Sequence, residues 1–273
     1  MTELLGSVAV ITGAARGQGR SHAVALAAEG ADIIAIDRCA DIESIPYPLA
    51  TKAHLDETVA AVEAVGRRVV PVVADVRDLD ELQQAVQAGI DELGDVDIVV
   101  ANAGVVAIGN KDPLDTQLYR DIVETNLNGV WHTIVATVPS IIRKGQGGSI
   151  ILTSSAQGLV GRGGDGSAAM FAYAAAKHGV VGLMRSAANA YAQYNIRVNS
   201  VHPTGVATPM IMNKFTATRI KENPKGSALS ANLLPVPYVE SEDVTNAVVW
   251  LASPKARYVT GATLPVDAGH TVM

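Results

Sequence analysis

The sequence feature that most constrains the fold is a glycine-rich turn directly behind the first predicted strand. The apolar residues 8–11 form that strand, and residues 12–19 follow as Thr-Gly-Ala-Ala-Arg-Gly-Gln-Gly. We expect a helix from about residue 18 to residue 29, ended by Gly30. Backbone N–H groups at the start of such a helix can face a pyrophosphate, whose negative charge the helix N-terminus favours. The turn therefore predicts a dinucleotide-binding α/β unit.

Alternating strands and helices continue along the rest of the chain. Further strands are predicted at residues 31–36, 68–74, 96–100, 149–153, 196–201 and 263–266. Helices are predicted at residues 54–65, 79–93, 113–144 (with a break near Gly129 or Pro139), 171–194 and 241–251 (with Ser241 as N-cap). The alternation predicts one α/β domain over residues 1–273. Its core would be a Rossmann-type, doubly wound parallel sheet of about seven strands with helices on both faces.

Composition disfavours several classes of partner. The net charge is −6 and the isoelectric point is near 5.5, which argues against nucleic acid or an anionic membrane as the main partner. Cys39 is the only cysteine, so no internal disulfide can form, as expected for a protein of the reducing cytoplasm. No apolar run reaches the roughly 18 residues of a membrane span. The six histidines show no ligand spacing, so we expect no metal site.

A serine behind one strand and a tyrosine–lysine pair on the next helix form a candidate acid–base site. Ser155 follows strand 149–153, while Tyr173 and Lys177 are four residues apart and therefore share one helix face. A free tyrosine has a pKa of about 10, and an ammonium within about 4–6 Å lowers it. We therefore expect Lys177 to lower the pKa of Tyr173, and Ser155 to hold a substrate oxygen toward Tyr173.

Charged residues behind two other strands bear on the choice of nucleotide. Asp37 lies about twenty residues past the glycines, where an acid can bond the adenine ribose and repel a 2′-phosphate. Arg16 and Arg38 would instead favour that phosphate, so an NADPH-dependent carbonyl reductase stays open as an alternative. Asp75, behind the third strand, is placed to meet the adenine edge. The carboxylate of Asp37 favours NAD.

Two segments lack the periodicity of strands or helices. Residues 39–53 exceed the usual βα connection of about 2–6 residues, and Pro46 and Pro48 forbid a regular helix there. We expect an insertion that folds over the adenosine end of a cofactor. The apolar residues available for this contact are Ile42, Ile45, Tyr47 and Leu49. Residues 209–238 are expected to form a substrate lid with short helices.

Taken together, these motifs resemble the short-chain dehydrogenase/reductase family over essentially the full length of the chain. The matching positions are residues 12–19, Asp75, Asn102, Ala103, Gly104, Asn126, Ser155, Tyr173, Lys177 and residues 203–208. The insertion and its neighbouring motifs are similar to an actinobacterial, mycofactocin-associated branch that includes carveol dehydrogenases. The chain departs from the family pattern at Ala101, where asparagine is usual. It also has a long gap between Ser155 and Tyr173, which borders the substrate pocket.

The resemblance implies hydride transfer between NAD and a secondary alcohol or ketone. The substrates it suggests are carveol-like or other small hydrophobic alcohols. It implies four catalytic residues: Asn126, Ser155, Tyr173 and Lys177. Tyr173 would be the general base or acid, Lys177 would also bind the nicotinamide ribose, and Asn126 would hold a water that relays the proton. The implied cofactor contacts are Gly13, Arg16, Gly17, Gln18, Gly19, Asp37, Arg38, Cys39, Asp75, Val76, Asn102, Ala103, Gly104, Thr125, Thr153, Tyr173, Lys177, Pro203, Val206 and Thr208.

Three further expectations concern assembly and exchange. The helices around Asn126 and Tyr173 carry more apolar residues than one core-facing stripe, which a family-like homotetramer would bury. These residues are Val123, Leu127, Val130, Trp131, Ile134, Val180, Val181, Leu183 and Met184. A covered NAD would exchange slowly and would need an external redox partner. A nucleotide-sensing binding protein on the same fold is the other alternative, but it would be expected to lack the tyrosine or the lysine.

Overall fold

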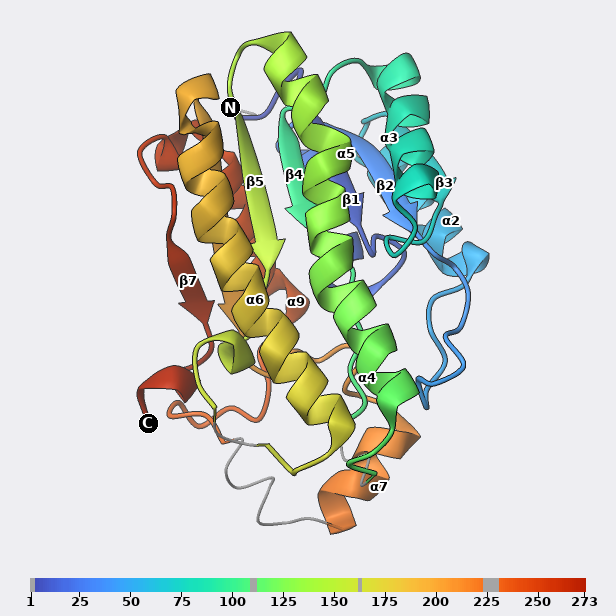
Figure 1. Cartoon of the computed structure of the whole chain (residues 1–273). Coiled ribbons are helices and arrows are strands. Elements are labelled where there is room, and N and C mark those ends of the chain that lie inside the picture. Colours follow the sequence, from blue (N-terminus) through green and yellow to red (C-terminus); the bar gives the residue numbers. More distant parts are fainter. Residues whose placement is uncertain (1–2, 109–111, 162–163, 223–230) are drawn as a thin grey trace.

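The computed structural model describes residues 3–108, 112–161, 164–222 and 231–273. Its centre is a sheet of seven parallel strands in the order β3-β2-β1-β4-β5-β6-β7. In Figure 1, α5 and α6 lie in front of this sheet and α9 lies behind it. The strand order reverses between β1 and β4, and ligands bind outside the carboxyl ends of strands at such a point. The predicted doubly wound parallel sheet is confirmed.

Most predicted elements recur with small shifts of their ends. The strands are β1 Val8–Thr12, β2 Asp32–Asp37, β3 Val69–Val73, β4 Ile98–Ala101, β5 Gly148–Thr153, β6 Ile196–Pro203 and β7 Thr263–Val266. The helices are α1 Gly17–Ala28, α2 Lys52–Ala64, α3 Leu79–Leu93, α4 Thr116–Val123, α5 Gly129–Lys144, α6 Ala168–Tyr191, α7 Lys214–Glu222 and α9 Ser241–Ala252. Part of the predicted lid, residues 223–230, lies outside the described residues. Within the described ranges, no helix is long and apolar enough to cross a membrane.

The apolar strands are buried because helices cover both faces of the sheet. In β1, Ala9 and Ile11 join a core cluster that includes residues of α1 and α9. Val8 and Val10 point the other way and join a cluster that includes residues of α3, α5 and α6. Burial on both faces explains why the strands are continuous apolar runs rather than alternating ones.

The long helix predicted for residues 113–144 breaks at a single π-helical turn, Glu124–Asn128, immediately before Gly129. Pro139, the other expected position of the break, lies inside α5. Within the turn the Asn126 amide is fully buried and bonds both polar groups of the Val105 backbone. Asn126 Oδ1 accepts from Val105 N at 2.8 Å, and Asn126 Nδ2 donates to Val105 O at 2.7 Å. This turn thereby fixes the segment that follows β4.

Two other sequence-based expectations need correction. Glu240, not Ser241, caps α9, because the Glu240 side chain bonds the first turn while its N–H donates to the Asp243 carboxylate at 2.8 Å. Several apolar residues counted as surplus on α5 and α6 are buried in the core of the chain itself. They are Val130, Ile134, Val180, Val181 and Met184. Trp131, in contrast, is 47% exposed.

A histidine packed between α1 and α9 has no role in the predicted site. His22 is completely buried, and its Nδ1 lies 2.7 Å from Thr245 Oγ1. Its Nε2 has no hydrogen-bond partner among the described residues. Burial lowers the pKa of His22 to about 3, so the ring is neutral at physiological pH.

Replacing Asn126 by alanine should destabilise the fold strongly. The change leaves the N–H and C=O of Val105 buried without partners, at a cost of about 1–3 kcal/mol for each group. We expect the free energy of unfolding in urea to fall by about 2–5 kcal/mol. Asn128→Ala in the same turn loses only a surface contact with Glu124 and should cost less than about 1 kcal/mol. Equal losses in the two variants would contradict this role of Asn126.

His22 should also make the fold sensitive to acid. Its pKa is lower in the folded protein than in the unfolded chain, so the unfolded state binds more protons below about pH 6.5. This part of the stability is present above that pH and is lost as the pH falls toward the folded pKa. Between about pH 7 and about pH 5 the loss should be about 2 kcal/mol.

His22→Asn keeps a polar atom near Thr245 but removes the titrating ring. We expect urea unfolding of this variant to show a smaller loss between the two pH values, whereas His178→Asn, at an exposed position, should behave like the parent protein. An unchanged pH dependence in His22→Asn would show that other groups cause the acid sensitivity.

Candidate active site

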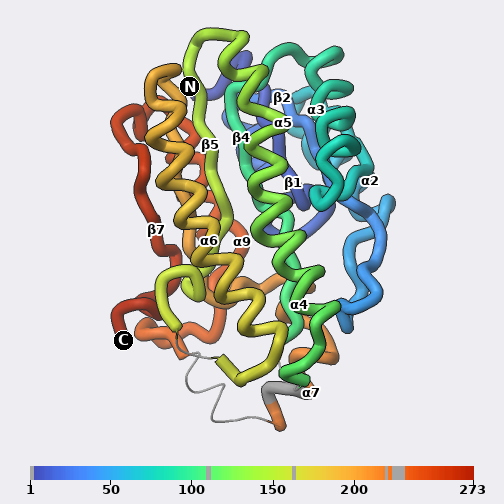
Figure 2. The backbone as a smooth tube through the Cα atoms, in the orientation of Figure 1, coloured from blue at the N-terminus to red at the C-terminus, as the bar shows by residue number. Residues whose placement is uncertain are grey.

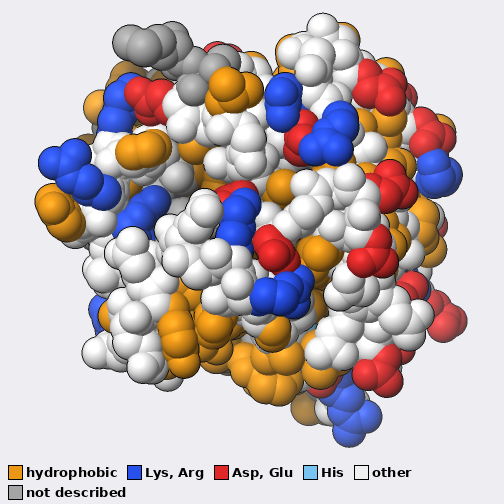
Figure 3. Space-filling model, turned by 90° about the horizontal axis from the view of Figure 1, so that it is seen from above, with side chains coloured by type: hydrophobic (Ala, Val, Ile, Leu, Met, Phe, Trp, Pro, Cys, Tyr) orange, Lys and Arg blue, Asp and Glu red, His pale blue; other side chains and the backbone are white. Residues whose placement is uncertain are grey.

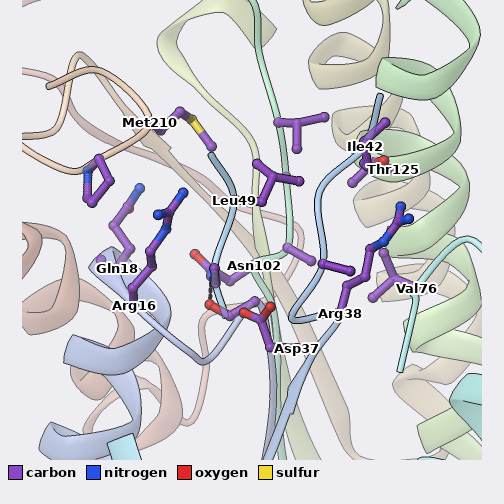
Figure 4. A pocket seen from close by; sticks show the side chains of 18 of the residues that line it. Arg16, Gln18, Asp37, Arg38, Ile42, Leu49, Val76, Asn102, Thr125 and Met210 are labelled. Atoms are coloured by element: carbon purple, nitrogen blue, oxygen red, sulfur yellow. Dashed lines mark hydrogen bonds between the residues drawn. The ribbon is translucent and has the colours of Figure 1, made fainter. Parts of the chain in front are cut away.

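A cavity at the carboxyl ends of β1, β2 and β4 collects most of the predicted cofactor residues. Figure 4 shows Arg16 and Gln18 on one side of it, Asp37 near its floor, and Arg38 and Val76 on the other side. The predicted residues that line it are Gly13, Arg16, Gly17, Gln18, Asp37, Arg38, Asp75, Val76, Asn102, Ala103, Gly104, Thr125 and Thr208. We call this space the cofactor cavity.

The glycines of the turn are required by its own packing. Gly13 has a positive φ of 67°, and a Cβ on it would lie 2.9 Å from the Cα of Ala103. A Cβ on Gly19 would lie 2.0 Å from the carbonyl oxygen of Gly13, so Gly19 lets α1 pack beneath the turn. Gly19 lines neither this cavity nor the one described next. Asn102 fixes the turn to β4 by donating from Nδ2 to Thr12 O at 3.1 Å.

The charged residues of the cofactor cavity are already partly engaged by the protein. Asp37 accepts from Ala15 N at 3.0 Å and from Cys39 N at 3.1 Å, which holds its carboxylate at the end of β2. Arg16 Nη2 donates to Pro48 O at 2.8 Å. Arg38 Nη1 lies 3.2 Å from the Asp75 carboxylate. Both arginines thus contact neighbouring groups of the chain, and Asp37 lines the cavity between them.

Asp75 lines the cavity, but two arginines hold its carboxylate. Burial alone would raise the pKa of Asp75, yet hydrogen bonds from Arg77 and the charges of Arg77 and Arg38 outweigh it and lower that pKa. Arg77 also reaches Asp121 of α4 at 2.9 Å. The adenine contact expected for Asp75 would therefore be made by an ionised, arginine-paired carboxylate.

The insertion packs into the molecule and lines the cofactor cavity. Ile42, Ile45 and Tyr47 are buried in a cluster with residues of α4 and α6. Figure 2 shows this loop, drawn in blue, beside α4. Tyr47 and Leu49 also line the cofactor cavity. The predicted apolar residues of the insertion thus face both a neighbouring helix and the cavity.

A second cavity of about 570 Å³ holds the acid–base residues, and we call it the substrate cavity. Ser155, Tyr173 and Lys177 all line it, and the Tyr173 hydroxyl shares a hydrogen bond with Ser155. Lys177 is buried, and its Nζ donates to Thr153 O at 2.7 Å. The same Nζ lies 5.7 Å from the centre of the Tyr173 ring. The structure therefore brings together the three residues expected from their spacing.

The pKa of Tyr173 in the protein without ligand is raised, whereas the sequence predicted that Lys177 would lower it. Burial raises the pKa of Tyr173 above its ordinary value, and the hydrogen bond with Ser155 offsets only part of this rise. Burial also lowers the pKa of Lys177 to about 8. The spacing of Tyr173 and Lys177 indicates that an ammonium lies near the phenol, but it does not indicate how far both groups are removed from water. The expected lowering of the Tyr173 pKa was therefore wrong for the protein without ligand.

Most of the remaining predicted residues also reach one of the two cavities. Thr153, Pro203 and Val206 line the substrate cavity. Cys39 does not line either cavity; it has a left-handed φ of 54° and packs against the core cluster under α1 and α9. Asn126 also lies outside both cavities, where its amide is occupied by Val105 as described above.

His202, which the sequence did not single out, bonds the backbone of Ser155. The ring is completely buried, with Nδ1 2.9 Å from Ser155 O and Nε2 2.8 Å from Ser200 Oγ. Burial lowers the pKa of His202 to about 4, so the ring is neutral. A carbonyl only accepts, so Nδ1 donates to Ser155 and Nε2 accepts from Ser200. A histidine at the end of an apolar strand is the only sequence signal of this role.

Several residues that line the substrate cavity come from distant parts of the chain, and the spacing of the sequence motifs did not predict them. They include Val106, Ile108, Gln157, Met170, Met210, Leu234, Tyr238 and His270. Leu234 and Tyr238 fall within the expected lid, whereas His270 lies close to the C-terminus. No motif links His270 to the acid–base residues, so only the fold reveals it.

Two buried oxygens fit a polar ligand that spans the cavities. Gln18 Oε1 and Thr153 Oγ1 are buried without a hydrogen-bond partner among the described residues. Gln18 lines both cavities and Thr153 lines the substrate cavity. Unpaired buried oxygens are costly unless a ligand donates to them. No metal-binding group of three or more histidine, cysteine or acidic side chains occurs in the described part of the chain.

Comparisons with known proteins identify relatives that align over nearly the whole chain. The chain is 48% identical to the (−)-trans-carveol dehydrogenase of Rhodococcus erythropolis, with 100% of both chains covered. It is 36% identical to the trans-4-hydroxycyclohexanecarboxylate dehydrogenase of Sinomonas cyclohexanicum, over 97% of this chain and 92% of the relative. The crystal structure of carveol dehydrogenase from Mycobacterium avium in complex with NAD superimposes with a TM-score of 0.92. It is 47% identical and covers 99% of each chain.

The profile of the short chain dehydrogenase family matches residues 7–219, which include the glycine-rich turn, Ser155, Tyr173 and Lys177. The match covers well over half of the chain, and the relatives above align over nearly all of it. The chain belongs to the short-chain dehydrogenase/reductase family.

Proposed function

We propose that this protein transfers a hydride between NAD and a secondary alcohol or ketone. The observation that carries the proposal is the trio Ser155, Tyr173 and Lys177 in the substrate cavity, next to a cofactor cavity that Asp37 lines. Relatives named as carveol and trans-4-hydroxycyclohexanecarboxylate dehydrogenases, and an NAD complex of a similar protein, support it.

The residues present fit the cofactor. Backbone N–H groups of the glycine-rich turn would hold the pyrophosphate at the N-terminus of α1, and Asp37 would accept from the adenine ribose. Gln18 Oε1 and Thr153 Oγ1 would accept hydrogen bonds from the nicotinamide end. NAD, when bound, supplies the hydride acceptor and a positive charge. Lys177, already anchored on Thr153 O, has further N–H donors for the nicotinamide ribose.

The protein's own residues would handle the proton. Ser155 would hold the substrate oxygen and Tyr173 would exchange the proton with it. With its raised pKa, Tyr173 is protonated at neutral pH and suited to donate a proton to a forming alkoxide. To act as a base in alcohol oxidation, Tyr173 needs additional positive charge beside it. We propose that a water on the backbone of the π-helical turn, rather than on the Asn126 amide, relays the proton.

For the substrate we propose a ring-borne secondary alcohol. The substrate cavity has predominantly apolar walls, including Val106, Ile108, Met170 and Leu234. These walls suit a carveol-like molecule or another small hydrophobic alcohol. A relative named for a hydroxycyclohexane compound supports the same class.

The alternatives are less well supported by the geometry. An NADPH-dependent reductase would use Arg16 and Arg38 to bind a 2′-phosphate. Arg16 donates to Pro48 O and Arg38 lies beside the Asp75 carboxylate, while Asp37 would repel the phosphate. A nucleotide sensor would not need Tyr173 and Lys177 together in the substrate cavity. We therefore retain NAD-dependent catalysis as the proposal.

Assembly and location complete the proposal. Residues 1–273 would act as one catalytic unit, with the insertion at about 39–53 slowing NAD exchange and the lid at about 209–238 bordering the substrate. An external redox partner would then reoxidise the bound cofactor, as the likeness to the mycofactocin-associated branch implies. We propose a homotetramer packed through α4, α5 and α6, since Trp131 and Phe171 are 47% and 63% exposed.

We further propose that the protein works in the cytoplasm, in keeping with its single, free Cys39. Acidic and basic side chains are interspersed on the face shown in Figure 3, with acidic ones gathered along one edge. That face therefore offers no continuous basic surface to nucleic acid or an anionic membrane.

Tyr173→Phe should abolish most turnover without loss of cofactor binding. The variant removes the hydroxyl that exchanges the proton, so the rate should fall by about 10²–10⁴-fold, the usual share of general acid–base catalysis. Turnover of cyclohexanol and carveol with NAD, under conditions where chemistry limits the rate, is the measurement. Tyr191→Phe, near the end of the same helix, serves as the control. Near-native turnover in Tyr173→Phe would rule out the proposed mechanism.

Asp37 should give the protein a preference for NAD over NADP. A carboxylate beside a 2′-phosphate repels it, so NAD should bind at least about tenfold more tightly, a difference of about 1.4 kcal/mol. Asp37→Asn should reduce that ratio, whereas Asp56→Asn, on the exposed surface of α2, should leave it unchanged. Calorimetric titration of both cofactors measures the ratio. Equal affinities in the parent protein would mean that Arg16 and Arg38 dominate.

A further inference from the structure

One stretch of backbone separates the two cavities, and we call residues 102–108 the partition. Asn102 and Gly104 line both cavities. Val105 lines the cofactor cavity, and Val106 lines the substrate cavity. Gln18, Thr208 and Met210 also line both cavities, so the position of the partition is one of the factors that set how closely groups in the two cavities can approach.

The partition is held by hydrogen bonds at three places. At its start, Asn102 N donates to Thr12 Oγ1 at 3.1 Å. In the middle, Asn126 bonds both polar groups of Val105. Next along the chain, Val106 N donates to the Tyr47 hydroxyl oxygen at 3.3 Å. The first two contacts come from β1 and the π-helical turn, whereas the third comes from the insertion.

Tyr47 is built into the site rather than laid on its surface. Its side chain is only 5% exposed and belongs to the same apolar cluster as Val105 and Ala107 of the partition. Tyr173 packs against that cluster from α6. Burial raises the pKa of Tyr47 to about 12, so its oxygen stays a neutral hydroxyl that can accept from Val106 N.

Other contacts hold the insertion without touching the partition. Ser44 Oγ donates to the Asp121 carboxylate of α4 at 2.7 Å, and Leu49 N donates to Asp41 Oδ1 at 2.7 Å. The contacts that hold the insertion can therefore be removed without removing the contact to the partition. Among Ser44, Tyr47 and Leu49, only Tyr47 bonds the partition.

We propose that Tyr47 is a positioning residue for the reaction, whose hydroxyl fixes Val106 and with it the partition between cofactor and substrate. The expected effect on catalysis rests on the proposed function, whereas the contact between Tyr47 and Val106 does not. Loss of the hydroxyl leaves Val106 N buried without its partner and lets the partition shift. Reacting groups lose alignment when such a wall moves, and turnover falls more than binding does.

The test compares Tyr47→Phe with two controls in the full chain. Tyr119→Phe changes a 40% exposed tyrosine on α4, and Ser44→Ala loosens the insertion but keeps Tyr47. The measurements are the amide hydrogen exchange of Val106, kcat and KM for cyclohexanol and carveol with NAD, and the dissociation rate of NAD. Exchange needs no substrate, so it reports on the contact even in an inactive protein.

We expect Tyr47→Phe to speed exchange at Val106 by about fivefold or more and to lower kcat by about fivefold to tenfold, with KM changed less than about twofold. Ser44→Ala should speed NAD release with kcat unchanged, and Tyr119→Phe should change nothing. Unchanged exchange at Val106 in Tyr47→Phe would overturn the contact. Faster exchange with unchanged kcat would overturn the positioning role. Absence of alcohol turnover in the parent protein would instead refute the proposed function, leaving the exchange result to decide whether Tyr47 holds the partition.

Discussion

The hydrogen bond from the Lys177 ammonium to the Thr153 carbonyl is the contact on which the site depends. It is 2.7 Å long and joins the middle of α6 to the last residue of β5. The reverse contact, from Ser154 Oγ to Lys177 O at 2.8 Å, doubles this connection. A buried ammonium is unfavourable unless strong acceptors hold it, so this bond offsets part of the cost of burying Lys177. Docking in this way brings Tyr173 over the end of β5, beside Ser155.

The same exclusion of water sets the protonation of the site. It lowers the pKa of Lys177 to about 8 and raises the pKa of Tyr173, and it keeps His202 neutral behind Ser155. The chain alone therefore builds a proton donor rather than a base. Alcohol oxidation requires the base form, which a positive charge beside Tyr173 would stabilise. In this account the direction of proton transfer is coupled to occupancy of the neighbouring cavity.

Local patterns in the sequence were sufficient for much of the fold. Apolar strands such as β1 stand out because both faces are covered, and Tyr173 and Lys177 share a helix face by spacing alone. The glycine-rich turn is recognisable because packing against Ala103 and Gly13 excludes larger residues. These features depend on neighbours in sequence or on strict steric limits, so they can be predicted from the sequence alone.

Features that depend on distant contacts could not be predicted in this way. The π-helical turn exists where Asn126 meets the Val105 backbone, and the link from His202 to Ser155 joins two strands. Tyr47 and Val106 are 59 positions apart in the sequence, so no local pattern predicts their contact. The direction of the Tyr173 pKa was missed for the same reason, because burial depends on everything packed around the ring.

The most direct test of this account is the ionisation of Tyr173 itself. An ultraviolet difference titration of the parent protein against Tyr173→Phe, first without nucleotide and then with NAD, isolates this one phenol. We expect the pKa of Tyr173 to lie above the ordinary value of about 10 in the nucleotide-free protein and to be lower with NAD bound. A pKa well below that value without nucleotide, or one that NAD does not change, would contradict it.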